Sequence, residues 1–316
     1  MKKNMNRRDF TRMSASAAAF LAVSPAGVLK TNNTNPASIP LGAPVFEKYE
    51  DPEGWINALS ALGYRASYTP VSINDDEITI KAYANAAKKA GIIIAEVGAW
   101  SNPISPDETQ RKEAFEKCTR SLQLADQLGA NCCVNVSGSR NKEHWAGPHM
   151  ENLTEETFEM VVESTRKIID EVKPRHTHFA LEAMPWSFPY SADSYLRLLK
   201  AIARDRFAVH LDPMNMITSP EIFFNNGEMI RDCFRKLGPH IRSCHAKDMT
   251  IREDIYTPQL DETRAGLGSM DYTAFLSELS KLDNVPLMIE HLKTADEYKL
   301  AADYIRSVAA ANGISM

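Results

Sequence analysis

Short apolar runs alternate with longer amphipathic stretches along most of this 316-residue chain. The amphipathic stretches have the spacing of helices, and several end at a glycine that can cap a helix, as at Gly63, Gly91 and Gly129. Strands that alternate with helices in this way are typical of parallel βα units. The expected strands are residues 64–68, 92–97, 132–136, 177–182, 207–212, 241–245 and 287–290.

An eighth strand has the weakest pattern and is expected at residues 41–45 or near Tyr49. Eight βα units fit one α/β domain, a (β/α)₈ TIM barrel of about 250 residues. An open doubly wound sheet would need a glycine-rich phosphate loop after its first strand, and the sequence has none there. We therefore predict a single (β/α)₈ barrel with parallel strands over residues 41–316.

The beginning of the chain differs from the rest. Arg7 and Arg8 precede a small, mildly apolar stretch at residues 13–23, which ends before Pro25. This pattern resembles a twin-arginine export signal, and its apolar part is shorter than the ~20 residues that span a bilayer. It predicts a twin-arginine-type signal peptide at residues 1–30, a linker at residues 31–40, a periplasmic location and no stable membrane insertion after processing.

The charge balance is acidic, with a formal net charge of −5. Surfaces that bind nucleic acid usually carry a basic stripe, and no run of Lys or Arg occurs beyond the N-terminus, so we expect no nucleic-acid partner. The five cysteines show no CxxC or zinc-finger spacing, and Cys132 and Cys133 are adjacent within an apolar run. This pattern favours buried free thiols.

Four of the expected strands end in the same way, with apolar residues followed by one side chain that can bind a metal. These side chains are Glu182, Asp212, His245 and Glu290. A single glutamate at a strand end is commonly a loop-facing charge, but the C-terminal ends of barrel strands converge on one mouth, so all four are expected to meet there. Three clustered carboxylates repel one another unless a cation neutralises them.

The sequence therefore predicts a divalent metal site in which these four residues are the ligands. Three carboxylate oxygens and one imidazole nitrogen favour Mn²⁺, Mg²⁺ or Co²⁺ over structural zinc, which prefers sulfur and nitrogen. Mn²⁺ is the preferred candidate, and Mg²⁺, Co²⁺ and Zn²⁺ remain open.

The motifs around these residues resemble those of the sugar phosphate isomerase/epimerase family, the xylose isomerase-like barrels. The resemblance spans roughly Trp55 to the C-terminus and includes a Gly-x-Gly-x-x-Asp loop at residues 266–271. Its strand-end motifs are Leu181-Glu182, His210-Leu211-Asp212, His245-Ala246-Lys247-Asp248 and Ile289-Glu290.

Ketose 3-epimerases of that family bind a divalent metal through residues that match the four predicted ligands. Their two glutamates, here Glu182 and Glu290, also serve as opposed acid and base catalysts. The resemblance thus implies a metal-dependent sugar isomerase or epimerase that removes a proton next to a carbonyl and passes through an enediolate. It also implies a small sugar or sugar derivative as the partner, and a homo-oligomer.

Three positions depart from the epimerase pattern. Asn215 stands where those enzymes have a His, Phe188 where they have a Glu, and Ile251 where they have an Arg, with Arg252 one step away. The metal-ligand residues match those of the epimerases, whereas the substrate-contacting positions differ. A lyase or hydratase of the same fold is therefore an alternative. It would act on a keto-sugar or keto-glycoside by the same proton removal, followed by loss of a β-substituent.

Further residues near the strand ends are candidates for substrate contact, each with a structural alternative. A histidine two residues before Asp212 shares its face but can equally be a core residue, and tryptophans stack on sugar rings but more often only pack. The loop at residues 138–152, which carries Trp145, is long enough to act as a lid or to line a site. The substrate-binding candidates are His210, Asn215, Lys247, Arg252, Trp186 and Glu96.

Two further functional classes can be built on this fold. A non-catalytic sugar-binding protein on an enzyme scaffold would have the same fold and the same cluster. A barrel endonuclease would need a larger set of metal ligands and a basic DNA groove, which the acidic charge balance disfavours.

Overall fold

The structure is a computed structural model that describes residues 38–316. The predicted signal peptide at residues 1–30 and residues 31–37 of the predicted linker lie outside the described residues. Among the helices that the structure describes, none is both long enough and apolar enough to cross a membrane.

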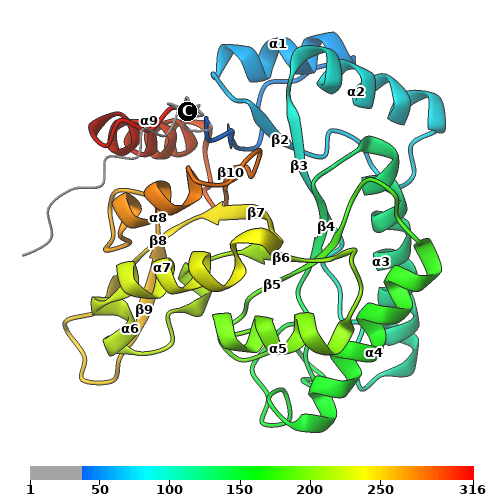
Figure 1. The fold of residues 1–316 in the computed structure, drawn as a ribbon, viewed down its shortest axis with the longest axis vertical. Helices are drawn as coiled ribbons and strands as arrows, with labels where there is room; N and C mark the ends of the chain where they lie inside the picture. Colours follow the sequence, from blue (N-terminus) through cyan, green and yellow to red (C-terminus); the bar gives the residue numbers. More distant parts are fainter. Residues whose placement is uncertain (1–37) are drawn as a thin grey trace, which may run out of the picture. The chain divides into compact units, whose positions relative to one another are not determined.

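Eight parallel strands close into a barrel, with the helices arranged around its outside (Figure 1). The predicted (β/α)₈ architecture is therefore confirmed. The first strand lies within residues 41–45 and not near Tyr49, and it closes the ring by pairing with both β10 and β2. In their order around the barrel, the strands are β1 (Leu41–Gly42), β10 (Leu287–Ile289), β7 (Ile241–Ala246), β6 (Phe207–Leu211), β5 (Phe179–Glu182), β4 (Cys132–Asn135), β3 (Ile93–Gly98) and β2 (Ala66–Tyr68).

The helices begin and end largely where the sequence signals them. Gly91 and Gly129 cap two helices in the left-handed conformation, each with φ of 68°, which a residue without a Cβ adopts at little cost. The helices are α1 (Pro52–Ala61), α2 (Glu77–Ala90), α3 (Glu108–Leu128), α4 (Glu155–Val172), α5 (Ala192–Ile202), α6 (Pro220–Phe224), α7 (Asn226–Leu237), α8 (Tyr272–Leu279) and α9 (Ala295–Ala311).

The expected single helix at residues 221–237 is wrong, because the structure divides it at Asn225 into α6 and α7. The side chain of Asn226 donates to the carbonyl oxygens of Phe223 (2.7 Å) and Ser269 (2.9 Å) and accepts from the backbone N–H of Asp271 (2.7 Å). These bonds to loop backbone compete with a continuous helix.

A two-stranded antiparallel hairpin that the sequence analysis did not predict lies between β7 and α8. Its strands are β8 (Asp248–Ile251) and β9 (Leu260–Thr263). The carboxylate of Asp248 accepts hydrogen bonds from the backbone N–H groups of Gly266 (3.0 Å), Gly268 (3.1 Å) and Met270 (2.8 Å). Asp248 thereby holds the glycine loop at residues 266–271 against the base of the hairpin.

Small side chains fill part of the barrel between the strands. One buried group consists of Cys132, Val134, Ala180 and Ala208 from three neighbouring strands. The larger hydrophobic core lies between the strands and the surrounding helices. The expectation of buried free thiols is confirmed for all five cysteines.

Candidate metal centre and its cavity

The four predicted ligands are positioned by the alternation of side chains along their strands. Ala180 and Ala208 are buried inside the barrel, and residues two further along point to the same side, which directs Glu182 and His210 inward. The structure brings Glu182, Asp212, His245 and Glu290 together so that one ligand atom of each lies within 4.8 Å of the others. Such a group is able to hold a divalent metal ion.

Lys247 reaches into the same cluster from the residue just after β7. Its Nζ lies 2.6 Å from Oε1 of Glu290, 2.7 Å from Oδ2 of Asp212 and 3.9 Å from Oε1 of Glu182. The side chain is only 2% exposed, so these ion pairs are shielded from water. Nδ1 of His245 also contacts the cluster, 2.9 Å from Oε1 of Glu290 and 3.1 Å from Oε1 of Glu182.

Two carboxylate oxygens in the cluster show that its residues suit a cation. Oδ2 of Asp212 and Oε1 of Glu290 are buried and have no partner in hydrogen-bond geometry, although Lys247 is near both. The other oxygen of Asp212 accepts from the backbone N–H of Met214 (3.0 Å), and the amide of Asn215 donates to Oε1 of Glu182 (3.1 Å). These neighbouring groups orient the carboxylates while the free oxygens face the centre.

The protonation of these groups is interdependent. Burial raises the pKa of Asp212 above its usual range despite the opposing charge of Lys247. Burial also favours a high pKa for Glu182 and Glu290, but the charge of His245 outweighs it and holds both pKa values low. Burial disfavours the charged forms of His245 and Lys247, but the carboxylates outweigh it and raise both pKa values well above their usual range. The positive charge of His245 thus favours the ionised forms of Glu182 and Glu290, whereas Lys247 does not fully offset the burial of Asp212.

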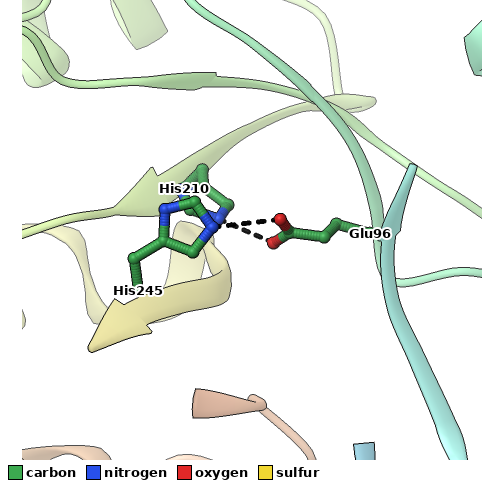
Figure 2. A group of neighbouring side chains, drawn as sticks. All are labelled: Glu96, His210 and His245. Carbon is green, nitrogen blue, oxygen red and sulfur yellow. Dashed lines mark hydrogen bonds and ion pairs between the residues drawn. The ribbon is translucent and has the colours of Figure 1, made fainter. Parts of the chain in front are cut away.

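Glu96 joins two buried histidines behind the cluster (Figure 2). Its Oε1 lies 3.0 Å from Nε2 of His245, and its Oε2 lies 2.7 Å from Nε2 of His210 and 2.9 Å from the hydroxyl of Ser243. The three residues also satisfy the geometry of a small metal site, but these distances are those of hydrogen bonds from both rings to one carboxylate. If a metal ion bound, a proton kept at Nε2 of His245 by Glu96 would leave Nδ1 as the nitrogen available to the ion.

A cavity of ≈1040 Å³ lies beside the cluster at the C-terminal ends of the strands, and Asp212 and His245 are buried and do not line it. Both glutamates of the cluster line it, and partly exposed aromatic and apolar side chains surround them. The predicted candidates that line it are Glu96, Glu182, Trp186, Asn215, Lys247 and Glu290, and Trp145 from the loop at residues 138–152 lines it as well.

Two substrate-binding predictions are not supported by the geometry, and a third is redefined. His210 is fully buried and bonds Glu96, so it has no surface in the cavity. Arg252 lies beyond the end of β8 with its guanidinium on Asp254, at 2.6 and 3.0 Å, and is not among the cavity residues. Glu96 does line the cavity, but both of its oxygens are engaged by neighbours, which makes it a support for His245.

Several cavity residues were missed by the sequence analysis. His291 follows Glu290 with a positive φ of 60°, and its Nδ1 lies 3.0 Å from a carboxylate oxygen of Glu262 on β9. The hydrogen bond to Glu262 raises the pKa of His291 above its usual value. Tyr68 also lines the cavity and donates to the carbonyl oxygen of Ile289 (3.2 Å). The position of His291 next to the predicted ligand Glu290 was the one signal in the sequence for a place in the cavity. Glu262 could not be placed there from the sequence, because it lies on a hairpin whose strands have no strong sequence pattern.

Comparison with known proteins agrees with this architecture. A model of the xylose isomerase-like TIM barrel family matches residues 56–308, and the chain belongs to that family. No curated protein matches the sequence.

Solved structures with the same fold carry different activities. D-Psicose 3-epimerase from Clostridium cellulolyticum H10, in complex with D-tagatose, is 17% identical, with 85% of this chain and 99% of that chain covered and a TM-score of 0.61. A xylose isomerase-like barrel protein from Mycobacterium smegmatis in complex with magnesium is 15% identical (87% and 97% covered, TM-score 0.60). Endonuclease IV from Thermus thermophilus is 14% identical (86% and 99% covered, TM-score 0.65). At these identities the likeness establishes the fold, and the site has to decide the chemistry.

Proposed function

We propose that this protein is a divalent-metal-dependent isomerase or epimerase that acts on a sugar or sugar derivative by moving a proton next to a carbonyl. The observation that carries the proposal is the cluster of Glu182, Asp212, His245 and Glu290, whose two glutamates line a cavity large enough for a sugar. Membership of a family whose fold includes the D-psicose 3-epimerase supports the same reaction class.

The residues that would hold the ion are the three carboxylates of the cluster and Nδ1 of His245. Oxygen-rich sets of this kind suit Mn²⁺, Mg²⁺ and Co²⁺, and we propose Mn²⁺ as the first ion to test. When bound, the ion supplies positive charge that stabilises a negative oxygen developing on the substrate. The hydrogen bond from Nε2 of His245 to Glu96 keeps the ring oriented for this role.

Glu182 and Glu290 are the proposed acid and base. They lie at the ends of β5 and β10, which are separated in the barrel by β6 and β7, so their carboxylates approach the cavity from two sides. One carboxylate takes the proton from the carbon beside the carbonyl, and the other returns a proton to the opposite face of that carbon. The amide of Asn215 fixes an oxygen of Glu182, and the ammonium of Lys247 offsets the charge of Glu290.

The test combines metal analysis with solvent exchange. The purified protein should contain close to one divalent ion per chain, and the Mn²⁺-loaded form should incorporate deuterium from D₂O into at least one sugar of a ketose panel. The variants E182Q and E290Q should abolish that incorporation. Metal-free protein that binds no added divalent ion, or loaded protein that exchanges no proton in any sugar, would contradict the proposal; sugar binding without exchange would indicate a non-catalytic binding protein.

A keto-glycoside lyase is the second candidate, and the position of Phe188 favours it. The epimerase resemblance places a substrate-contacting glutamate there, whereas Phe188 is buried and packs against Phe158 with ring centroids 5.3 Å apart. The substrate contact expected of an epimerase is therefore missing at this position, whereas the residues proposed to abstract the proton are present. Incubation with a 3-keto-glycoside separates the two: release of the aglycone supports the lyase, and an epimerised ketose without release supports the isomerase.

We further propose that the protein is exported to the periplasm through the twin-arginine signal at residues 1–30. The paired Arg7 and Arg8 ahead of the short apolar stretch support this. A fusion of residues 1–40 to a reporter that is active only after folded export tests it. Replacement of both arginines by lysine should retain the reporter inside the cell, and unchanged export of that variant would contradict twin-arginine transport.

A further inference from the structure

The cavity has two differently built sides, which follow from the order of the strands. The metal-ligand residues come from β5, β6, β7 and β10, which are contiguous in the barrel. Three tryptophans line the cavity from loops after β3, β4 and β5, which form the adjoining part of the ring. These residues, here called the tryptophan wall, are Trp100, Trp145 and Trp186.

The two sides also differ in depth. The side chains of Glu182, Asp212 and Glu290 are 6%, 0% and 13% exposed. Trp100, Trp145 and Trp186 are 37%, 41% and 37% exposed. The cavity therefore runs from a buried acidic floor to a partly open aromatic rim, and exposed aromatic surface that lines a cavity is typical of a binding surface.

Two of the tryptophans are held in place by specific contacts. Nε1 of Trp186 donates to the carbonyl oxygen of Ala146 (2.7 Å), which ties the loop after β5 to the loop at residues 138–152. The indole of Trp100 lies against Gly98, where a Cβ would collide with the ring. Trp100 and Trp186 are thus preorganised, and a ligand that stacks on them does not need to order these two rings first.

The size of the cavity exceeds what one sugar ring requires. A volume of ≈1040 Å³ is at the upper end of the range of about 300–1,000 Å³ found for pockets that enclose drug-sized ligands, and a single hexose is much smaller than such ligands. A hexose with its reacting carbon between Glu182 and Glu290 would leave the tryptophan wall uncovered. Tryptophan faces stack on the apolar C–H faces of sugar rings and on aromatic rings.

We propose that the tryptophan wall is a subsite for a second ring, so that the substrate is a two-ring sugar derivative whose reacting sugar lies on the acidic floor. The inference deepens the proposed function and rests on it for the identity of the reacting sugar. The second ring is either another sugar or an aromatic aglycone, because both offer the flat apolar face that an indole binds.

Calorimetric titration of the Mn²⁺-loaded protein with matched ligand pairs tests the subsite. One arm compares D-fructose with its glucosylated forms turanose and palatinose; the other compares methyl β-D-glucoside with phenyl β-D-glucoside. At least one two-ring ligand should bind about tenfold more tightly than its one-ring partner, as stacking on one or two aromatic rings predicts. The arm that shows the preference identifies the second ring as a sugar or as an aromatic group.

The variants W145A and W100A should reduce that preference about threefold or more. They lie on loops after different strands, so a folding defect in one leaves the other as a test. The matched control is M150A, which alters a 91% exposed side chain on the same segment as Trp145 and outside the cavity lining, and it should keep the preference. Equal or weaker binding of every two-ring ligand, no binding of any ligand, or a preference unaffected by both tryptophan variants would overturn the subsite.

The result for the subsite can be distinguished from the result for the proposed enzymatic function. A two-ring preference without deuterium exchange in any sugar would contradict the enzyme and leave the subsite standing. Deuterium exchange into free ketoses without a two-ring preference would support the enzyme and remove the subsite.

Discussion

Polar side chains near the two ends of the barrel have opposite roles. At the C-terminal ends, Glu182 and Glu290 line a cavity and Asp212 is buried beside them, and two oxygens of these carboxylates lack hydrogen-bond partners. Near the N-terminal ends, Asp126 at the end of α3 accepts hydrogen bonds from three successive backbone N–H groups. These belong to Arg175 (2.8 Å), His176 (2.6 Å) and Thr177 (3.1 Å).

Basic residues also lie at the N-terminal end. Arg206 and Arg242 lie at the starts of β6 and β7, and His178 precedes β5. Asn131 donates to the carbonyl oxygens of Arg242 (3.0 Å) and Asn284 (2.9 Å), which closes this end with backbone contacts. The difference indicates that polar groups at one end stabilise loops, whereas those at the other end are kept for a ligand, as in barrels generally.

The largest expected effect is on catalysis at the C-terminal end. In E182Q and E290Q, the rate of deuterium incorporation into the substrate should fall by about 10²–10⁴-fold, because an amide cannot accept the substrate proton. Nuclear magnetic resonance of the product measures the rate, and E171Q on the exposed face of α4 is the matched control. Wild-type rates in both cavity variants would remove the functional contrast between the two ends.

Replacement of Lys247 should show that the cluster depends on positive charge. In metal-free protein, K247M should lower the free energy of unfolding by about 3–5 kcal/mol, because Asp212 and Glu290 remain buried without their ion-pair partner. Saturating Mn²⁺ should restore part of that loss, because the ion would neutralise Asp212 and Glu290 in place of Lys247 and should therefore bind the variant more tightly than the wild type.

Urea unfolding with chelator and with Mn²⁺ measures both values. The control K281M removes an exposed lysine that pairs with Glu278 and should change stability by less than about 1 kcal/mol. A loss in K247M that is the same with and without the ion would contradict the interpretation of the cluster as a cation site.

At the N-terminal end, a substitution should affect stability alone. D126A removes the acceptor of three backbone N–H groups and should lower the free energy of unfolding by about 1–3 kcal/mol. Its Mn²⁺ affinity, measured by calorimetry, should equal that of the wild type. A clear loss of metal affinity in D126A would show that the two ends are coupled.

The smallest expected effect is the pH dependence that arises from His178. Burial, together with the charges of Arg242 and Arg206, lowers the pKa of this half-buried ring to about 4. Between pH ~6.5 and about 4 the unfolded state therefore binds a proton that the folded state does not, so stability falls as the pH falls through this range and then levels off.

Denaturant unfolding of wild type and H178Q at several pH values measures this contribution. The variant should lose less stability than the wild type over that interval, and the difference should be modest because the ring is partly solvated. Parallel profiles for the two proteins would show that His178 does not titrate differently on folding.

The repeated strand-and-helix pattern was enough to predict the barrel, because periodicity and glycine caps are local properties of the chain. The strand-end positions of Glu182, Asp212, His245 and Glu290 also allowed their convergence to be predicted, since parallel closure brings such ends to one mouth. Local signals failed at Asn225, where side-chain bonds to a distant loop interrupt the helix, and at the hairpin of β8 and β9, whose strands are short and partly exposed.

The amino-acid sequence by itself therefore determined the fold class and the candidate metal ligands. Only the tertiary structure decided which groups surround those ligands: that Lys247 lies between Asp212 and Glu290, that Glu96 supports His245, and that three tryptophans gather on one side of the cavity. The physical reason is that these contacts join residues far apart in the chain, whose distances depend on barrel closure, strand register and loop paths that no local pattern encodes.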